Sequence, residues 1–132
     1  MNTTDVLVVD DDTDIRDSIS LLLKYEGYDV STASNGSEGF EQLKIKRPSL
    51  ILLDLMMPIM DGWQFKTEID LNPDLKNIPI IVVSADGNIK NKSESIGVSE
   101  YLAKPIDIDS LLTMVKKYCN TTQPREANQI LI

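Results

Sequence analysis

The chain has 132 residues, the usual size of one domain, and its hydrophobic fraction of 42% is too high for a disordered chain. Lys and Arg number 13 and Asp and Glu 21, so the net charge is −8, which argues against nucleic acid or an anionic membrane as the main partner. With one cysteine and no histidine, the chain has no internal disulfide, cysteine zinc cluster, Ser-His-Asp triad or phosphotransfer histidine of its own.

Short apolar runs alternate along the chain with longer amphipathic stretches. Apolar runs without polar alternation are typical of strands buried on both faces of a parallel sheet. Strands are predicted over residues 6–9, 28–33, 50–53, 78–83 and 101–103. Helices are predicted over residues 13–25, 37–46, 62–69, 90–96 and 107–119.

The predicted helices have recognisable ends and apolar faces. Thr13 or Asp14 is an expected N-cap of the first helix, capping is also the favoured role of Asp12, and Gly27 is expected to stop the helix. The fourth helix is short and rich in Asn and Ser, so the surface around it is expected to be mobile. A strand followed by a helix, five times over, predicts an α/β fold with right-handed crossovers and a parallel sheet.

The predicted domain covers residues 1–119, and residues 120–132 form a C-terminal tail that is polar until its last three residues. No signal peptide is visible, and no apolar stretch approaches the roughly 18 residues of a membrane span. We therefore expect a cytoplasmic domain without membrane contact.

Polar residues follow four of the five predicted strands. Asp10 and Asp11 follow the first strand, Asp54 follows the third, Ser84 ends the fourth and Lys104 follows the fifth. In an open parallel sheet, ligands bind beyond the carboxyl ends of the strands, so these side chains are expected to meet there.

Such a group of side chains suits a cation and a phosphoryl group. Clustered carboxylates repel one another unless a cation neutralises them, and hard oxygen ligands favour Mg²⁺. Lys104 would neutralise an anionic group on Asp54, and Ser84 would donate a hydrogen bond to it. An aspartate carboxylate also acts as the nucleophile in phosphoryl transfer, forming an acyl phosphate.

Four segments in this order resemble the receiver domain of response regulators in two-component signalling, of the single-domain, chemotaxis-regulator type. They are VVDD at 8–11, LDLMMPIMDG at 53–62, VSA at 83–85 and YLAKP at 101–105. The resemblance covers about residues 5–119. It implies a doubly wound, flavodoxin-like fold, with five parallel strands in the order 2-1-3-4-5 and five helices.

The resemblance also implies the role of each acidic residue. Asp54 would be the phosphoacceptor, and Asp10, Asp11 and Asp54 would hold Mg²⁺ together with the backbone carbonyl of Met56. Met56 stands where many family members have a polar residue, and we expect this to affect the lifetime of the phosphorylated state. The donor would be a histidine kinase or a histidine phosphotransfer protein.

The remaining implied roles concern contact with the phosphoryl group and signalling. Ser84 and Lys104 would contact the phosphoryl group, and Pro105 would follow a cis peptide bond. Tyr101 would be the switch residue that turns inward when Ser84 moves. Output would pass through protein contacts or a phosphorelay, without direct DNA binding, and the chain could be part of a longer regulator or hybrid kinase.

Other aspartate-based functions fit the sequence less well. An EF-hand loop starting at Asp10 fails, because Ile15 and Leu21 stand where Gly and Glu are required. A haloacid-dehalogenase-type phosphatase fits Asp10 and Asp12, but Asp14 occupies the place of Thr or Val. Two alternatives remain: a small phosphohydrolase with a separate substrate, and a degenerate receiver that binds constitutively. The favoured interpretation is a receiver domain, which turns over no separate substrate and is therefore not expected to be an enzyme.

Overall fold

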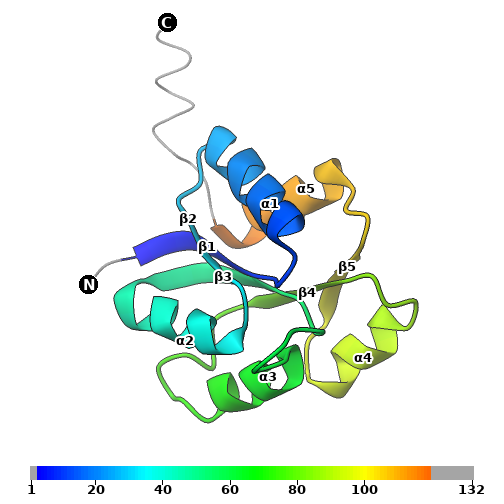
Figure 1. Ribbon diagram of the computed structural model, residues 1–132. Coiled ribbons are helices and arrows are strands. Elements are labelled where there is room, and N and C mark those ends of the chain that lie inside the picture. The colour runs from blue at the N-terminus through cyan, green and yellow to red at the C-terminus, as the bar shows by residue number, and fades with distance from the viewer. Residues whose placement is uncertain (1–2, 120–132) are drawn as a thin grey trace, which may run out of the picture.

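The computed structural model describes residues 3–119, in which strands and helices alternate throughout (Figure 1). The strands are β1 (Thr3–Val9), β2 (Val30–Ala33), β3 (Arg47–Leu53), β4 (Ile80–Ser84) and β5 (Glu100–Ala103). The helices are α1 (Thr13–Tyr25), α2 (Gly36–Ile45), α3 (Gly62–Asp70), α4 (Ile89–Ser95) and α5 (Ile108–Cys119). The predicted tail over 120–132 lies outside the described residues.

All five strands are parallel and form one sheet in the order β2-β1-β3-β4-β5, which confirms the doubly wound fold. Helices α1 and α5 cover one face of the sheet, and α2, α3 and α4 cover the other (Figure 1). The register aligns Val9 with both Ala33 and Leu53, and Ser84 with Ala103. Strands β2, β1 and β3 therefore end level, as do β4 and β5, while β4 extends two residues past the end of β3; the loops that follow the strands meet at this edge.

The core consists of apolar strand residues that alternate between the two faces of the sheet. Val8 and Leu52 pack with Leu111 and Val115 of α5 on one face. On the other face, β1 and β3 pack against Phe65 and Ile69 of α3, and Phe65 lies 4.9 Å from Phe40 between ring centroids. Burial of both faces explains why the strands appear in the sequence as unbroken apolar runs.

The ends of the elements differ from the predicted ones where polar residues extend a strand. β3 begins at Arg47 and includes Pro48, both of which precede the predicted strand over 50–53. At this level β3 pairs only with β1, since its pairing with β4 begins at Ile51. Proline is tolerated there because no second neighbour requires its missing N–H.

The N-cap of α1 is Asp12, which confirms capping as its role, whereas the alternatives Thr13 and Asp14 lie inside the helix. The side chain of Asp12 accepts a hydrogen bond of 3.1 Å from the backbone N–H of Ile15. Asp12 is in an extended conformation, whereas Thr13 is already helical, and a capping residue needs the extended conformation. None of the helices within residues 3–119 is long and apolar enough to cross a membrane.

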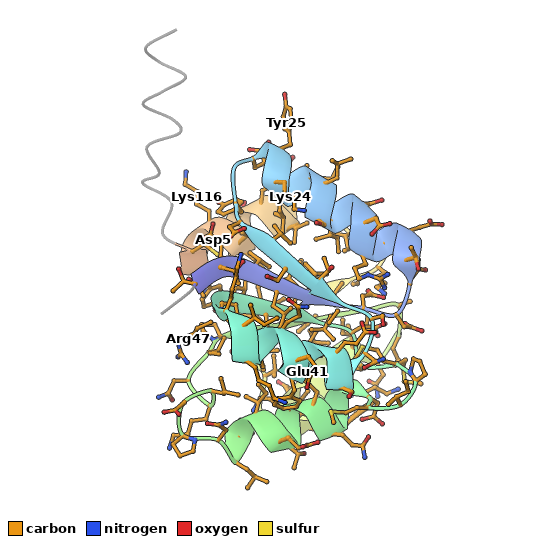
Figure 2. All side chains as sticks on the ribbon, turned by 60° about the vertical axis from the view of Figure 1, so that its left-hand side comes forward. Asp5, Lys24, Tyr25, Glu41, Arg47 and Lys116 are labelled. Carbon is orange, nitrogen blue, oxygen red and sulfur yellow. The ribbon has the colours of Figure 1, made fainter. Side chains whose placement is uncertain are left out.

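Cys119 at the end of α5 is a buried thiol whose S–H donates to the Asp5 carbonyl of β1 at 3.6 Å. Figure 2 shows Asp5 near this end of α5. Burial, together with the negative charge of Asp5, raises the pKa of Cys119 to about 12. A thiol reacts as its thiolate, so Cys119 is expected to be unreactive in the native protein.

We expect alkylation of Cys119 by iodoacetamide at pH 8 to be on the order of 1,000-fold slower in native protein than in protein unfolded in urea, because the thiolate fraction differs by about that factor. Because the native pKa lies above the unfolded value of about 8.5, the unfolded chain loses this proton first. The stability contribution of the protonated thiol is therefore complete below that pH and is lost as the pH rises through 12. Equal alkylation rates in the two states would contradict the buried position.

Candidate functional site

Four polar residues at the ends of different strands lie at the carboxyl edge of the sheet. They are Asp10 after β1, Asp54 after β3, Ser84 at the end of β4 and Lys104 after β5. The hydrogen-bond ladder continues past the strands into this region: the Asp54 N–H donates to the Val9 carbonyl at 2.9 Å. In the same way, the Lys104 N–H donates to the Ser84 carbonyl at 2.9 Å. The sheet itself therefore fixes the backbone positions of Asp54 and Lys104.

Three carboxylates form the acidic part of the site. Asp10, Asp11 and Asp54 each offer an oxygen, and these oxygens lie within 4.8 Å of one another. Asp10 is 2% exposed and Asp54 is 6% exposed, whereas Asp11 is open to solvent. A set of close, hard oxygen donors with one open side fits a small divalent cation such as Mg²⁺.

Lys104 is the cation that contacts the two buried carboxylates. Its Nζ lies 2.8 Å from Oδ2 of Asp10 and 3.6 Å from Oδ2 of Asp54, so its shorter contact is with Asp10. The Lys104–Pro105 peptide bond is cis, as the resemblance implied. One positive charge thus faces two buried negative charges, which leaves the site with an excess of negative charge.

The excess of negative charge is reflected in the pKa values of Asp54 and Lys104. Burial, and then the negative charge of Asp10, raise the pKa of Asp54 from 3.8 to about 6, against the opposing effects of Lys104 and the Met56 amide. Although burial disfavours the charged form of Lys104, its contacts with Asp10 and Asp54 outweigh that effect and raise its pKa. Added positive charge is therefore favourable in this site.

Further contacts orient the acidic residues. Oδ1 of Asp10 accepts from the Asp12 N–H at 2.9 Å, and the Asp10 carbonyl accepts from Nη1 of Arg16 at 2.8 Å. Arg16 was missed by sequence reasoning, because an arginine one turn into a helix matches no pattern. The Met56 N–H donates to Oδ1 of Asp54 at 3.3 Å, while the Met56 side chain is exposed. That the backbone carbonyl of Met56 is a metal ligand remains a prediction.

Ser84 and Tyr101 lie on the neighbouring strands β4 and β5, where Tyr101 is paired with Val82. Ser84 is 2% exposed, and its Oγ accepts a hydrogen bond of 3.2 Å from the Asp86 N–H. Tyr101 is half-buried and packs against the cluster that contains Leu55 and Val82. That the two side chains move together is a prediction.

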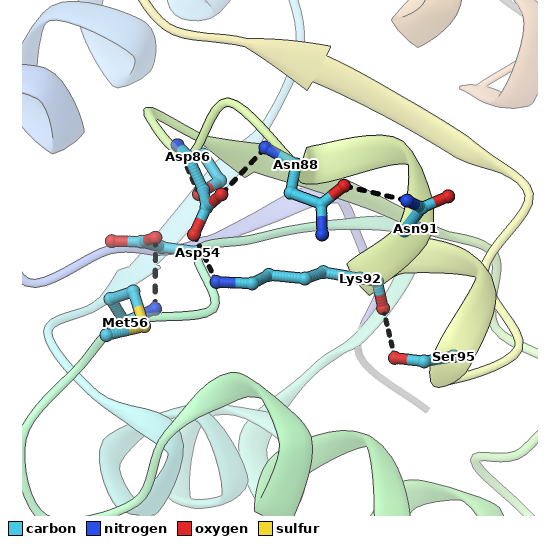
Figure 3. A network of polar contacts seen from close by, with 8 residues as sticks. Asp54, Met56, Asp86, Asn88, Asn91, Lys92 and Ser95 are labelled. Atoms are coloured by element: carbon cyan, nitrogen blue, oxygen red, sulfur yellow. Dashed lines mark hydrogen bonds and ion pairs between the residues drawn. The ribbon is translucent and has the colours of Figure 1, made fainter.

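A polar network beside the site was also missed by sequence reasoning. Asp86, in the loop between β4 and α4, forms an ion pair with Lys92 of α4 (Figure 3). The pKa of the Asp86 carboxyl is lowered, first by its hydrogen bond with Lys92 and then by that with the Asn88 amide. The two residues are six positions apart across a loop, a spacing that carries no sequence signal.

A doubly wound parallel sheet with paired aspartates and a lysine at its carboxyl edge defines a receiver-type phosphoacceptor domain. Residues 6–116 match the family model of the response regulator receiver domain. The chain therefore belongs to this family, whose members serve as phosphoacceptors in two-component signalling.

Individual relatives agree with this assignment. The chain is 34% identical over 119 residues to RpaA of Synechocystis, a DNA-binding transcriptional regulator, and this match covers 89% of the chain but 49% of RpaA. It therefore spans about half the length of that relative. An uncharacterised 14.6 kDa protein of Leptolyngbya boryana is also 34% identical, with 91% of this chain and 93% of that protein covered.

Among solved structures, the chemotaxis response regulator CheY4 of Vibrio cholerae superimposes with a TM-score of 0.78 at 29% identity. The superposition covers 88% of this chain and 98% of CheY4. The backbone arrangement is thus shared over nearly the whole of that receiver domain.

Proposed function

We propose that Asp54 accepts a phosphoryl group from the phosphohistidine of a histidine kinase or a histidine phosphotransfer protein. The observation that carries this proposal is the position of Asp54: its carboxylate is buried, adjoins Asp10 and lies 3.6 Å from Lys104. Asp10, Asp11, Asp54 and the Met56 carbonyl would hold Mg²⁺. When bound, Mg²⁺ supplies positive charge that offsets the negative charge of the carboxylates and of the phosphoryl oxygens.

In the transfer, a carboxylate oxygen of Asp54 forms a bond to phosphorus as the bond from phosphorus to the histidine nitrogen breaks. The electron pair of the broken bond stays on the imidazole. The Asp54 backbone is fixed by its hydrogen bond to Val9, so the chain contributes mainly positioning and charge. Lys104 Nζ makes its shorter contact with Asp10 before transfer. It lies close enough to Asp54 to pair with the additional negative charge once Asp54 is phosphorylated.

The proposed signal arises from the same charge increase. The Ser84 hydroxyl would donate to a phosphoryl oxygen, and Tyr101 would move toward the space that Ser84 leaves. Phosphorylation would thereby shift the population between two conformations of the face formed by α4, β5 and α5. In this role the domain modifies itself and turns over no separate substrate, so we do not class it as an enzyme.

A partner that carries a phosphohistidine must dock beside Asp54. An apolar groove of about 390 Å³ lies between α1 and the β5–α5 loop, and Lys104 forms part of its lining. Ile15, Ile19 and Leu22 of α1 line it, with Ile106 from the loop. We propose that this groove is part of the docking surface, because it adjoins the acceptor site. We also propose that the domain is cytoplasmic.

We expect a single phosphoryl adduct, measured as intact mass, after incubation with acetyl phosphate and Mg²⁺. The adduct should be absent in Asp54→Asn and in the presence of EDTA. The matched control is Asp61→Asn, which removes one negative charge at the N-cap of α3 and keeps a capping side chain.

Three outcomes would contradict the proposal. An adduct that persists in Asp54→Asn would place the acceptor elsewhere. Phosphate released from an aryl phosphate over many turnovers per chain would indicate a phosphohydrolase. A folded, Mg²⁺-binding protein that forms no adduct with acetyl phosphate or with a phosphohistidine donor would indicate a constitutive binding module.

A further inference from the structure

The ion pair between Asp86 and Lys92 connects three elements around the acceptor site. Asp86 belongs to the loop after β4, and Lys92 belongs to α4. The Lys92 Nζ also lies 5.9 Å from the ring centroid of Trp63 in α3, a cation–π distance. Figure 3 shows the Lys92 side chain extending from α4 toward Asp86, on the side of the network that faces Asp54 and Met56.

Asp86 is tied to Ser84 as well as to Lys92. Its backbone N–H donates to Oγ of Ser84 at 3.2 Å, while its Oδ1 accepts from the Asn88 N–H at 2.7 Å. Its other carboxylate oxygen, Oδ2, pairs with Lys92. One loop residue therefore holds both the hydroxyl expected to contact the phosphoryl group and the helix next to it.

Few other polar contacts hold α4 in place. The helix has 7 residues, and the Asn88 side chain makes no capping hydrogen bond. Within residues 3–119, the fully buried Ser93 hydroxyl of α4 has no hydrogen-bond partner. An unsatisfied buried hydroxyl destabilises the conformation that contains it, so α4 is held mainly by its apolar contacts and by Lys92.

We propose that the Asp86–Lys92 ion pair, which we name the α4 latch, holds Ser84 in its resting hydrogen bond and α4 in its resting position. Asp86 and Lys92 are positioning residues that act on phosphorylation through Ser84. This inference rests on the proposed function, because it takes Ser84 as a contact of the phosphoryl group.

The expected coupling follows from the hydrogen bonds. If the Ser84 hydroxyl moves to donate to a phosphoryl oxygen, the Asp86 N–H loses its acceptor and the loop must rearrange. Rearrangement of the loop displaces the Asp86 carboxylate from Lys92 and releases α4. Coupling between two sites is reciprocal, so opening the latch should in turn make phosphorylation easier.

The test compares Asp86→Asn and Lys92→Gln, with Lys90→Gln as the control that removes the same charge from an exposed position of the same helix. The rate of adduct formation with acetyl phosphate and Mg²⁺ is measured by intact mass. We expect both latch variants to raise this rate about two- to fivefold, the range of a partly exposed ion pair. The double variant should not exceed the larger single effect.

The direction of the two changes distinguishes the latch from simple electrostatics. Asp86→Asn removes a negative charge and Lys92→Gln a positive one, so direct effects on an anionic donor would have opposite signs. The latch instead requires the same sign for both. Opposite signs, additive effects in the double variant, or an equal effect of Lys90→Gln would overturn the proposal.

A second measurement does not depend on phosphorylation. Amide hydrogen exchange over residues 85–96 of the unmodified protein should accelerate in both latch variants, and not in Lys90→Gln. Unchanged exchange in this segment would overturn the latch. If no variant and no wild-type protein forms an adduct, the phosphoacceptor proposal fails, and the exchange result still decides whether the ion pair holds α4.

Discussion

Replacing Gly62 with alanine is expected to lower the free energy of unfolding by about 3 kcal/mol, the upper end of the usual range for overpacking. A Cβ at this position would lie 2.7 Å from the Asp54 carbonyl oxygen and 2.7 Å from the Leu55 Cα. Both are backbone atoms, and the Gly62 N–H donates to the Leu55 carbonyl at 2.9 Å. The segment that follows the acceptor would therefore have to move as a whole.

Gly87→Ala is the matched control, because a Cβ there meets no atom within 4 Å. We expect this change to alter stability by less than about 0.5 kcal/mol. Urea unfolding followed by circular dichroism measures both variants, independently of the fluorescence of the neighbouring Trp63. Equal stability of the two alanine variants would contradict the close packing of Gly62 against Asp54 and Leu55, directly after β3.

The Gly62→Ala change should also slow phosphorylation, because the new methyl group displaces the carbonyl oxygen of Asp54, the proposed phosphoacceptor. We expect Gly62→Ala to phosphorylate at least about tenfold more slowly, because small misplacements of reacting groups cost large factors in rate. An unchanged rate in a destabilised variant would show that Asp54 keeps its position despite the clash.

Lys104→Met is expected to lower the free energy of unfolding by about 2–3 kcal/mol in metal-free buffer. Methionine retains the length of the side chain but leaves Asp10 and Asp54 without the cation that lies 2.8 Å and 3.6 Å away. Removing one partner of a buried ion pair is costly because the remaining charge stays desolvated. Urea unfolding in the presence of EDTA measures the loss.

Lys117→Met provides the matched control for this change. Lys117 pairs with Glu100 at 3.2 Å, but its side chain is 61% exposed, so its removal should cost less than about 0.5 kcal/mol. Adding Asp54→Asn to Lys104→Met should recover part of the lost stability by removing one of the two uncompensated charges. A Lys104→Met protein as stable as the wild type would contradict the electrostatic account of the site.

Much of the fold follows from local sequence pattern. Buried strands such as 6–9 and 50–53 are continuous apolar runs, and each is followed by an amphipathic stretch with recognisable ends. Because a strand, a helix and the next parallel strand form a unit with one preferred hand, this pattern leads to a parallel sheet. The same rule places Asp10, Asp54 and Lys104 at one edge, because each directly follows a strand. The strand order itself came from the family resemblance.

Other features of the site depend on contacts between segments far apart in the chain. The sequence contains Gly62, but its close approach to the Asp54 carbonyl exists only once α3 packs against the end of β3. The pKa of Asp54 rises to about 6 only because folding buries it beside Asp10. Likewise, Asp86 and Lys92 pair because the loop after β4 turns back toward α4.

The sequence by itself therefore determined the class of fold, the order of its elements and the residues that chemistry requires at the strand ends. These follow from hydrophobic period and from residue type, which are local properties. Only the tertiary structure decided which capping residue starts α1, how strongly the carboxylates repel one another and which lysine holds Asp86. Those properties depend on distance and burial, which exist only after the helices have packed on the sheet.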